Sequence, residues 1–120
     1  MKLGVVSAIL DQSNFEEMIT IVSENGLDCV EVACWPQGKA ERRYAGVSHI
    51  DTAALTEAKA EELLGFCRAK GVEISSLAYY PNPLDENPEK RKEAVEHLCT
   101  LIDASKLLGV DMVTTFIGRM

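Results

Sequence analysis

One pattern occurs three times in this chain, and it constrains the fold more than any other feature. Residues 26–30 (GLDCV), 71–75 (GVEIS) and 109–113 (GVDMV) each contain a glycine, an apolar residue, an acidic residue and a short strand-like run. Each glycine follows a helical pattern, and a glycine that adopts positive φ commonly ends a helix. The repeat therefore predicts helix–glycine–strand units that follow one another along the chain.

Three helices are predicted from apolar side chains that recur every three or four residues. These side chains are Phe15, Met18, Ile19 and Val22; Ala60, Leu63, Leu64 and Cys67; and Ala94, Leu98, Leu101, Ile102 and Leu108. Ser13 and Glu16 have the spacing of a capping box at the start of the first helix. Asn87 and Pro88 offer a capping residue and a first-turn proline for the third helix. Each helix is therefore expected to bury one apolar face.

Four short apolar segments alternate with these helices and are predicted to be strands: 3–9, 29–34, 74–79 and 112–116. Strands that are covered on both faces are typically short and apolar. Strict alternation of strands and helices favours one parallel sheet with right-handed crossovers. Because no linker or low-complexity tract interrupts the pattern, residues 1–120 are expected to form a single unit. The longest irregular segment, 37–56, is where a functional loop after the second strand would lie.

Two architectures fit this alternation, a doubly wound open sheet and part of a closed barrel. A dinucleotide-binding sheet would have a glycine-rich turn after its first strand, whereas residues 10–14 (LDQSN) contain no glycine. A complete eight-unit barrel typically needs about 250 residues, and this chain has 120. The predicted fold class is therefore α/β, a partial (β/α)8 TIM barrel with four parallel strands: an N-terminal half without its C-terminal half.

Charge and cysteine content disfavour several classes of function. The net charge is −7 and there are only short clusters of Lys and Arg, so a nucleic-acid partner is not expected. No apolar run approaches the roughly 20 residues of a membrane span, and residues 1–6 resemble a strand rather than a targeting signal. We therefore expect a cytoplasmic protein. The four cysteines lie in apolar segments without C-x-x-C spacing, which predicts small buried thiols rather than disulfides or a zinc site.

The strongest candidate for a functional residue is a glutamate in the second strand. In a parallel barrel the active site forms at the C-terminal ends of the strands. Alternation places Val30 and Val32 on one face of that strand and Glu31 on the other, so Glu31 is expected to point into the barrel. An unpaired buried carboxylate is very unfavourable. Glu31 is therefore either a hydrogen-bonded structural residue or a group that binds substrate or supports a metal shell.

The other candidates follow the second, third and fourth strands. Trp35 could stack on a sugar ring or cap the core. Tyr79, Tyr80 and Asn82 belong to a segment stiffened by prolines, which presents polar groups at little ordering cost, although the tyrosines could instead be packing residues. Arg119 is either a ligand for an anionic substrate group or a solvated arginine near a chain end.

No known catalytic or metal-binding motif accompanies these candidates. His49 and His97 lack a spaced partner that would suggest a metal site, so we expect structural or solvent-exposed roles for both. G-x-S-x-G, Walker and H-E-x-x-H patterns are also absent from the sequence. No metal ligand is therefore predicted within this chain.

Taken in order, several segments resemble the xylose isomerase-like TIM barrels, in particular the sugar phosphate isomerase and epimerase group. Residues 26–32 (GLDCVEV) resemble the second strand of that family. Residues 79–91, 107–110 (LLGV) and 115–119 (TFIGR) resemble its third and fourth units. The resemblance covers nearly the whole chain, and it implies a TIM-barrel fold.

The resemblance also implies an activity. Isomerases and epimerases of this family move a proton at the carbon next to a carbonyl, with glutamates as acid and base and a divalent metal that stabilises the enediolate. The implied metal is manganese, magnesium, cobalt or zinc, held by residues of strands five to eight, which lie outside this chain. The residues left in this chain would be on the substrate side: Glu31, Trp35, Tyr79, Tyr80, Asn82 and Arg119.

A related branch of the family, the apurinic endonucleases, carries metal-binding histidines at the ends of the third and fourth strands. The corresponding positions here are Tyr79-Tyr80 and Thr115-Phe116, with no histidine. Together with the negative net charge, this argues against a DNA-repair enzyme.

Three functions remain to be compared. The first is the N-terminal half of a sugar isomerase or epimerase, inactive by itself. The second is a non-catalytic half-barrel that pairs with another copy through its exposed edges, because unpaired strand edges promote association. The third is a small open-sheet binding domain. The expected partners are a sugar or sugar phosphate and further copies of the chain, with no nucleic acid and no membrane.

Overall fold

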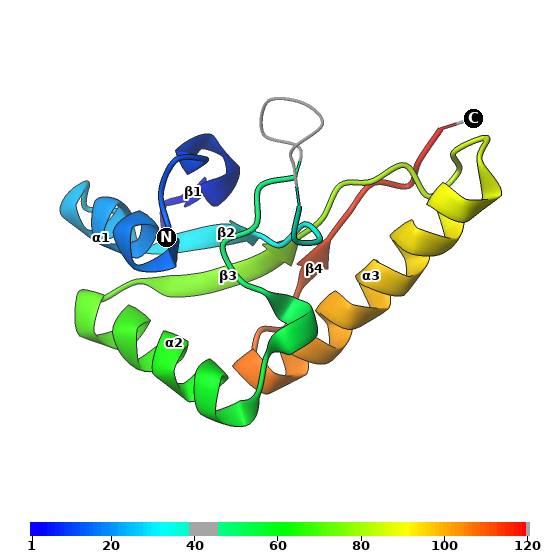
Figure 1. Cartoon of the computed structure of the whole chain (residues 1–120). Coiled ribbons are helices and arrows are strands. Elements are labelled where there is room, and N and C mark those ends of the chain that lie inside the picture. The colour runs from blue at the N-terminus through cyan, green and yellow to red at the C-terminus, as the bar shows by residue number, and fades with distance from the viewer. Residues whose placement is uncertain (39–45, 120) are drawn as a thin grey trace.

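The computed structural model of this chain describes residues 1–38 and 46–119. Residues 39–45, part of the irregular segment expected at 37–56, lie outside the described residues. Along the chain the elements are β1 (Gly4–Val6), the 3-10 helix η1 (Ser7–Leu10), α1 (Phe15–Glu24), β2 (Cys29–Ala33), the 3-10 helix η2 (Thr52–Ala54), α2 (Glu57–Lys70), β3 (Glu73–Ala78), α3 (Pro88–Leu108) and β4 (Val113–Thr114) (Figure 1).

The four strands form one sheet in the order β1-β2-β3-β4, and every neighbouring pair is parallel. A helix connects each strand to the next, as Figure 1 shows for the run from β1 to β4. Parallel neighbours require such crossover connections. The predicted fold class, a partial TIM barrel of parallel β/α units, is confirmed.

The core lies between the sheet and the three helices. Val30 and Val32 of β2 and Leu77 of β3 are completely buried in it. The helices contribute Phe15, Met18, Ile19 and Val22 from α1, Ala60, Leu63 and Cys67 from α2, and Leu101, Ala104 and Leu108 from α3. Burying one large aliphatic side chain stabilises the fold by about 1.5–3 kcal/mol. This apolar layer therefore determines which face of each strand turns toward the helices and which is left for polar side chains.

Two predicted strands are too long. The first, expected at 3–9, ends at Val6, because the side chain of Ser7 takes over as hydrogen-bond acceptor: the amide of Ala33 donates to Ser7 Oγ at 2.8 Å, and η1 follows. The last, expected at 112–116, contains only Val113 and Thr114. It pairs with Leu77 and Ala78, the final two residues of β3, so the ladder ends where β3 ends.

The helix ends follow the expected capping chemistry with one shift. The capping box at α1 is made by Asn14 and Glu17 rather than Ser13 and Glu16: the Glu17 amide donates to Asn14 Oδ1 at 2.8 Å and the Asn14 amide to Glu17 Oε1 at 3.3 Å. Asn87 caps α3 as predicted, accepting from the Glu89 amide at 2.9 Å. None of the described helices has the length and apolar character needed to cross a bilayer.

Two glycines of the repeat end helices in the left-handed conformation that the repeat predicts. Gly71 has φ 70° after α2, and Gly109 has φ 64° after α3. L-residues adopt this conformation only at a steric cost. Each glycine therefore turns the chain directly from a helix into the next strand.

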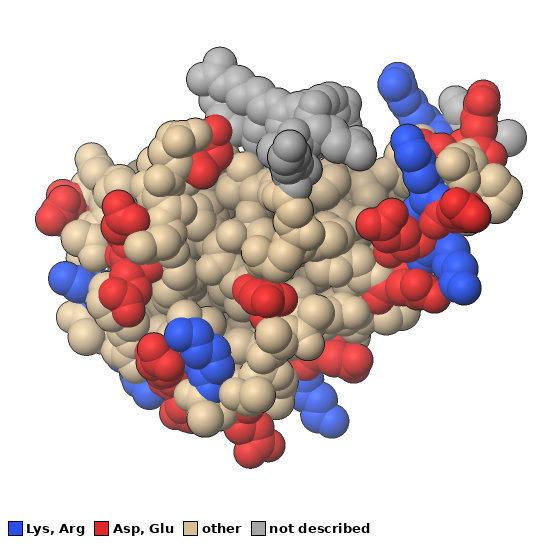
Figure 2. Space-filling view, in the orientation of Figure 1, with Lys and Arg blue, Asp and Glu red and all other residues tan. Residues whose placement is uncertain are grey.

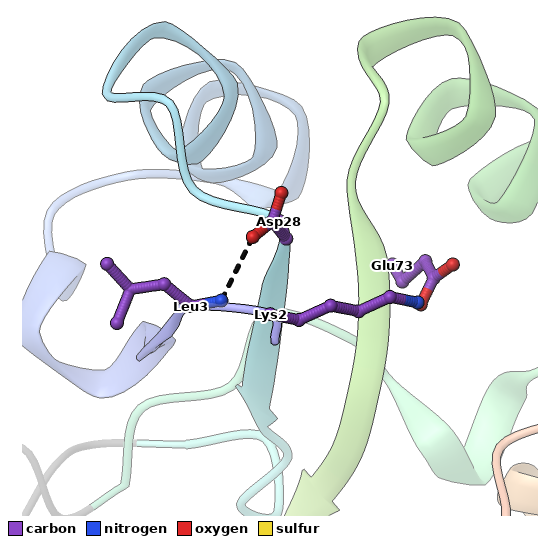
Figure 3. Close-up of polar contacts among 4 residues, drawn as sticks. All are labelled: Lys2, Leu3, Asp28 and Glu73. Atoms are coloured by element: carbon purple, nitrogen blue, oxygen red, sulfur yellow. Dashed lines mark hydrogen bonds and ion pairs between the residues drawn. The ribbon is translucent and has the colours of Figure 1, made fainter.

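In two of the three repeats the acidic residue contacts the segment that precedes β1. Asp28 accepts from the Leu3 amide at Oδ2 (2.9 Å), while its own amide donates to the Leu3 carbonyl at 2.8 Å (Figure 3). Glu73, at the same place in the next repeat, accepts from Lys2 Nζ at 2.6 Å. Figure 3 shows the Lys2 side chain crossing β2 to reach Glu73. The third acidic residue, Asp111, is exposed.

Only two of the four cysteines agree with the prediction of buried thiols. Cys34 and Cys67 are buried, Cys29 is half-buried and Cys99 is exposed; all four are free. Cys99 lies on α3 between Val95 and Ile102, which are 51% and 53% exposed. These three residues, here called the α3 flank, have the spacing of a helix-packing stripe. The sequence pattern assigned Ile102 to the core because α3 has apolar residues on two sides.

We expect Asp28→Ala to destabilise the chain by about 1 kcal/mol, because it removes the charged acceptor of the Leu3 amide at an exposed strand edge. Asp111→Ala, at the equivalent position of the third repeat, is the matched control and should change stability by less than about 0.5 kcal/mol. Urea unfolding followed by circular dichroism measures both. Equal effects of the two substitutions would contradict the role given to Asp28.

Candidate functional site

The face of the sheet turned away from the helices carries a cluster of polar side chains around Glu31. Glu31 Oε1 accepts hydrogen bonds from Ser76 Oγ at 3.3 Å, from the Tyr80 hydroxyl at 2.8 Å and from Thr114 Oγ1 at 2.6 Å. These four residues, the Glu31 cluster, come from β2, β3, the segment after β3 and β4. The expectation that Glu31 lies opposite Val30 and Val32 agrees with this arrangement.

A register shift in the sheet places Ser76 beside Glu31. Val30 pairs with Ile74, but Glu31 pairs with Ser76, so Ser75 has no partner in β2. An extra residue of this kind re-aims the side chains that follow it. From Ser76 onward, Leu77 faces the core and Tyr80 faces the Glu31 cluster. Simple alternation along the predicted strand could not have identified the shift.

The three hydroxyl donors hold the carboxylate in one orientation. All of them reach Oε1, whereas Oε2 receives no hydrogen bond from the described residues. Burial raises the pKa of Tyr80, and the charge and hydrogen bond of Glu31 act in the same direction, against the opposing effect of its bond with Thr114. Tyr80 thus remains a hydroxyl donor over the neutral pH range. Glu31 Oε1 is therefore held by three hydroxyls, while Oε2 has no hydrogen-bond partner among the described residues.

A hollow of about 300 Å³ lies at the same end of the sheet, between the segments after β2 and β3 and the start of α3. Four of the six predicted site residues line this hollow, here called the rim hollow: Trp35, Tyr79, Tyr80 and Asn82. Tyr80 belongs to both places, because its ring borders the rim hollow while its hydroxyl donates to Glu31. The structure therefore joins the predicted residues of the second and third strands into one continuous region.

Tyr79 is mainly a packing residue within this region. The residue is only 4% exposed, and its ring makes edge contacts with Trp35 and His97 at centroid distances of 4.9 and 4.6 Å. Burial raises the pKa of Tyr79 to about 12, with a smaller contribution from the charge of Glu93. His97 Nε2 donates to the carbonyl oxygen of Cys34 at 2.7 Å, which is the structural role expected for this histidine.

Asn82 holds the backbone of Arg119 rather than presenting its own amide freely. Asn82 Oδ1 accepts from the Arg119 amide at 2.8 Å, and Asn82 Nδ2 donates to the Arg119 carbonyl at 2.8 Å. Gly118 has φ 99°, and a Cβ there would lie 3.0 Å from Asn82 Oδ1 and from Pro83. Asn82 thereby positions the segment after β4 beside the rim hollow, while the Arg119 residue is exposed.

Several polar residues of this region were not singled out from the sequence. Ser76 and Thr114 complete the Glu31 cluster, and Asp85, Lys90 and Glu93 line the rim hollow. The last three belong to the loop before α3 and to its first turns. In the sequence they are marked only by their position after a strand of the barrel. Many charged residues that simply face solvent have the same position, so these three could not be singled out.

A metal site is not found among the described residues: no three side chains of His, Cys, Asp or Glu gather closely enough to hold an ion. Glu31 is the one carboxylate of its cluster, and its neighbours there are hydroxyls. The chemistry of this part of the chain therefore fits hydrogen bonding to a ligand and does not fit a divalent-metal centre.

A family model described as a xylose isomerase-like TIM barrel matches residues 19–120. The match covers most of the chain, including the Glu31 cluster and the rim hollow. The chain belongs to the xylose isomerase-like TIM barrel family. A comparison with curated proteins gives no match.

Solved structures similar to this xylose isomerase-like barrel include two enzymes. A D-psicose 3-epimerase from Clostridium cellulolyticum, solved with D-tagatose, has a TM-score of 0.66 at 19% identity over 96% of this chain and 37% of its own. The probable 3-DHS dehydratase AsbF from Bacillus anthracis has a TM-score of 0.65 at 17% identity over 99% of this chain and 39% of its own. These likenesses show the fold alone, and this chain spans less than two fifths of either structure's length.

We expect Thr114→Val to destabilise this xylose isomerase-like barrel chain by about 1–2 kcal/mol, because it removes the shortest of the three hydrogen bonds to the Glu31 carboxylate while keeping the side-chain shape. Thr115→Val, at the exposed neighbouring position, is the control and should change stability by less than about 0.5 kcal/mol. Urea unfolding at pH 7 measures both variants. A stability loss confined to Thr115→Val would contradict the assigned geometry.

Proposed function

We propose that this chain is the N-terminal part of a sugar or sugar phosphate isomerase or epimerase, and that it supplies substrate-side residues to the active site. The observation that carries the proposal is the Glu31 cluster: a carboxylate fixed by three hydroxyls, with one oxygen left for a ligand. Membership of the family and the likeness to a D-psicose 3-epimerase support the same assignment.

The chemistry of the proposed site suits a polyol. Glu31 Oε2 can accept a hydrogen bond from a sugar hydroxyl, and a bond to a charged acceptor is about twice as strong as a neutral one. The ring of Tyr80 contacts Phe116 at a centroid distance of 5.1 Å, which provides an apolar surface next to that acceptor. Trp35 lines the rim hollow together with Tyr80. Alternating carboxylate and aromatic groups match the alternating hydroxyls and C–H faces of a sugar ring.

The catalytic metal belongs to another part of the proposed enzyme. A divalent ion such as manganese, magnesium, cobalt or zinc would stabilise the enediolate charge of an isomerase or epimerase. Since the described residues hold no suitable ligand set, we assign the metal ligands and the acid and base to later β/α units. The role of this chain is to bind and orient the sugar, and we propose that it is inactive by itself.

The α3 flank supports the view that further β/α units pack against this one. α1 packs against α2, and α2 against α3. Val95, Cys99 and Ile102 lie on α3 and remain exposed. In a barrel of repeating units, the next helix along would cover such a flank.

Charge gives no support to a nucleic-acid function. On the face shown in Figure 2, acidic and basic side chains of the described residues are interspersed, and Lys and Arg form no continuous patch. A backbone-binding surface needs clustered positive charge. A nucleic acid is therefore not among the proposed ligands.

Binding of a ketohexose tests the proposal on the chain alone. Titrating 15N-labelled protein with D-tagatose should shift the amide signals of Glu31, Tyr80 and Thr114 with weak, saturable binding. Glu31→Gln should weaken this binding by about tenfold, because it removes a charged hydrogen-bond acceptor. Glu89→Gln, an exposed change on α3, should leave it unchanged. Amide signal changes that are confined to other regions would contradict a substrate-side role for Glu31. An equal loss of D-tagatose binding in Glu31→Gln and Glu89→Gln would also contradict it.

A half-barrel that pairs with a second copy is the other candidate function, and the two sheet edges favour it. Exposed apolar residues gather at both: Leu3, Val6 and Ile9 near β1, and Met112, Phe116 and Ile117 near β4. A twofold axis along the barrel would place the β4 edge of each copy beside the β1 edge of the other and keep all strands parallel. The eight strands of the two copies would then form a closed barrel.

If this pairing occurs, the chain should sediment at twice its 13.2 kDa mass at about 100 µM. Val6→Lys places a charge at the β1 edge and should restore the single-chain mass. Val95→Lys, on the α3 flank away from both edges, should leave the paired mass unchanged. Analytical ultracentrifugation distinguishes these outcomes. A wild-type chain that sediments as a monomer at this concentration would exclude the paired half-barrel.

A further inference from the structure

A buried chain of hydrogen bonds connects the end of β1 to the loop after β2. The Ala33 amide donates to Ser7 Oγ at 2.8 Å, Ser7 Oγ lies 2.8 Å from His49 Nδ1, and His49 Nε2 lies 3.2 Å from the Leu10 carbonyl oxygen. Ser7 is completely buried and His49 is 9% exposed. These four residues are here called the His49 chain.

Proton counting assigns a single arrangement to the His49 chain. The Leu10 carbonyl can only accept, so His49 Nε2 carries the proton and donates to it. Nδ1 is then an acceptor, which the Ser7 hydroxyl satisfies as donor. Ser7 Oγ still has a lone pair for the Ala33 amide. Every polar atom of the neutral arrangement is thus paired.

A second proton on His49 breaks this arrangement. Nδ1 would become a donor, Ser7 Oγ would have to accept from both His49 and Ala33, and the hydroxyl proton of Ser7 would lose its acceptor. A buried donor without a partner is unfavourable. The neutral imidazole is therefore the form that fits between Ser7 and Leu10.

We propose that His49 is a positioning residue that fixes residues 47–49 and the η1 segment together at the mouth of the barrel, and that protonation of its imidazole separates them. The proposal concerns this chain alone and does not depend on the sugar-binding function. Its consequence for that function is that one wall of the mouth becomes sensitive to pH.

The connection to the site runs through the short strip 47–49. The Trp35 amide donates to the Val47 carbonyl at 3.3 Å, and the His49 amide donates to the Ala33 carbonyl at 2.9 Å. Gln37 Nε2 donates to Ser48 Oγ at 3.0 Å, and Gln37 lines the rim hollow. Backbone pairing holds this strip to β2 and the residues directly after it, whereas the His49 side chain alone among these groups ties it to η1.

The charged groups around His49 are three carboxylates and one ammonium, so their net negative charge by itself favours the protonated imidazole and opposes the effect of burial. Glu16 of α1, Asp51 of the loop and Lys59 of α2 line the hollow of about 560 Å³ that His49 borders, and Asp11 follows η1. Burial lowers the pKa of His49, opposed by its hydrogen bonding to the backbone at Leu10 and Ser13. A lowered folded-state pKa means that the unfolded chain binds the proton first. The stabilisation is thus complete above the ordinary histidine value and is lost as pH falls through the lowered one.

Two measurements test the proposal. The histidine signals are simple to assign, because the chain has only two histidines. Nitrogen-15 spectra at pH 7.5 should show His49 in the form protonated at Nε2. Hydrogen exchange corrected for intrinsic rates should show the protection of the Ala33 amide falling about tenfold between pH 7.5 and pH 5, because protonation of His49 breaks the His49 chain. A His49 ring protonated at Nδ1 would overturn the assignment.

His49→Gln is the decisive variant, because glutamine offers one acceptor and one donor but does not titrate in this range. Its Ala33 protection should be independent of pH from 7.5 to 5, while the matched control His97→Gln should retain the wild-type fall. Equal pH dependence in both variants would overturn the proposal.

A second variant keeps the test decisive if His49→Gln does not fold. Ser7→Ala removes the hydroxyl, so Ala33 should be poorly protected at both pH values and the pKa of His49 should rise toward its ordinary value. An unchanged Ala33 protection in Ser7→Ala would also contradict the proposal.

Discussion

The parallel pairing of β2 with β3 is the constraint on which the rest of this structure depends. These central strands present Val30, Val32 and Leu77 to the helices, and burial of these side chains fixes which face points outward. The opposite face then has to accommodate Glu31. A carboxylate on a sheet face needs partners, and β3 and β4 supply them as hydroxyls. One apolar layer thus determines both the core and the position of the polar cluster.

Much of this arrangement could be predicted because it repeats. The glycine, the acidic residue and the helical periodicity are local signals, and together they imply parallel β/α units. The direction of Glu31 also follows from alternation within β2. The position of Ser76 could not be predicted in this way, because the register shift at Ser75 exists only in the pairing of two strands. Likewise, Ser7 follows the end of β1 and forms hydrogen bonds with Ala33 and His49, and both of these residues are far from Ser7 in the sequence.

The candidate site was predicted less completely for a related reason. The residues after each strand were identified by their place in the barrel, but their roles depend on packing between loops. Tyr79 and Tyr80 are adjacent in sequence, yet Tyr79 packs against His97 in the core while Tyr80 donates to Glu31. Asn82 uses both ends of its amide on the Arg119 backbone. Composition and spacing cannot distinguish a residue that contacts a ligand from one that positions the residue beside it.

The α3 flank and the sheet edges need different partners. The flank needs a helix that covers it, and each edge needs a parallel strand. A second copy would satisfy the edges of β1 and β4, since each needs a parallel strand. A second copy of the described residues would bring no helix into the place next to α3, because none of the described helices follows β4. Val95 and Ile102 would then stay in water, with the unfavourable exposure of two large aliphatic side chains. A further β/α unit, which carries its own helix after its strand, satisfies both demands at once. The apolar surface of α3 therefore supports the proposal that additional units of the same kind complete the fold, over the pairing of two identical halves.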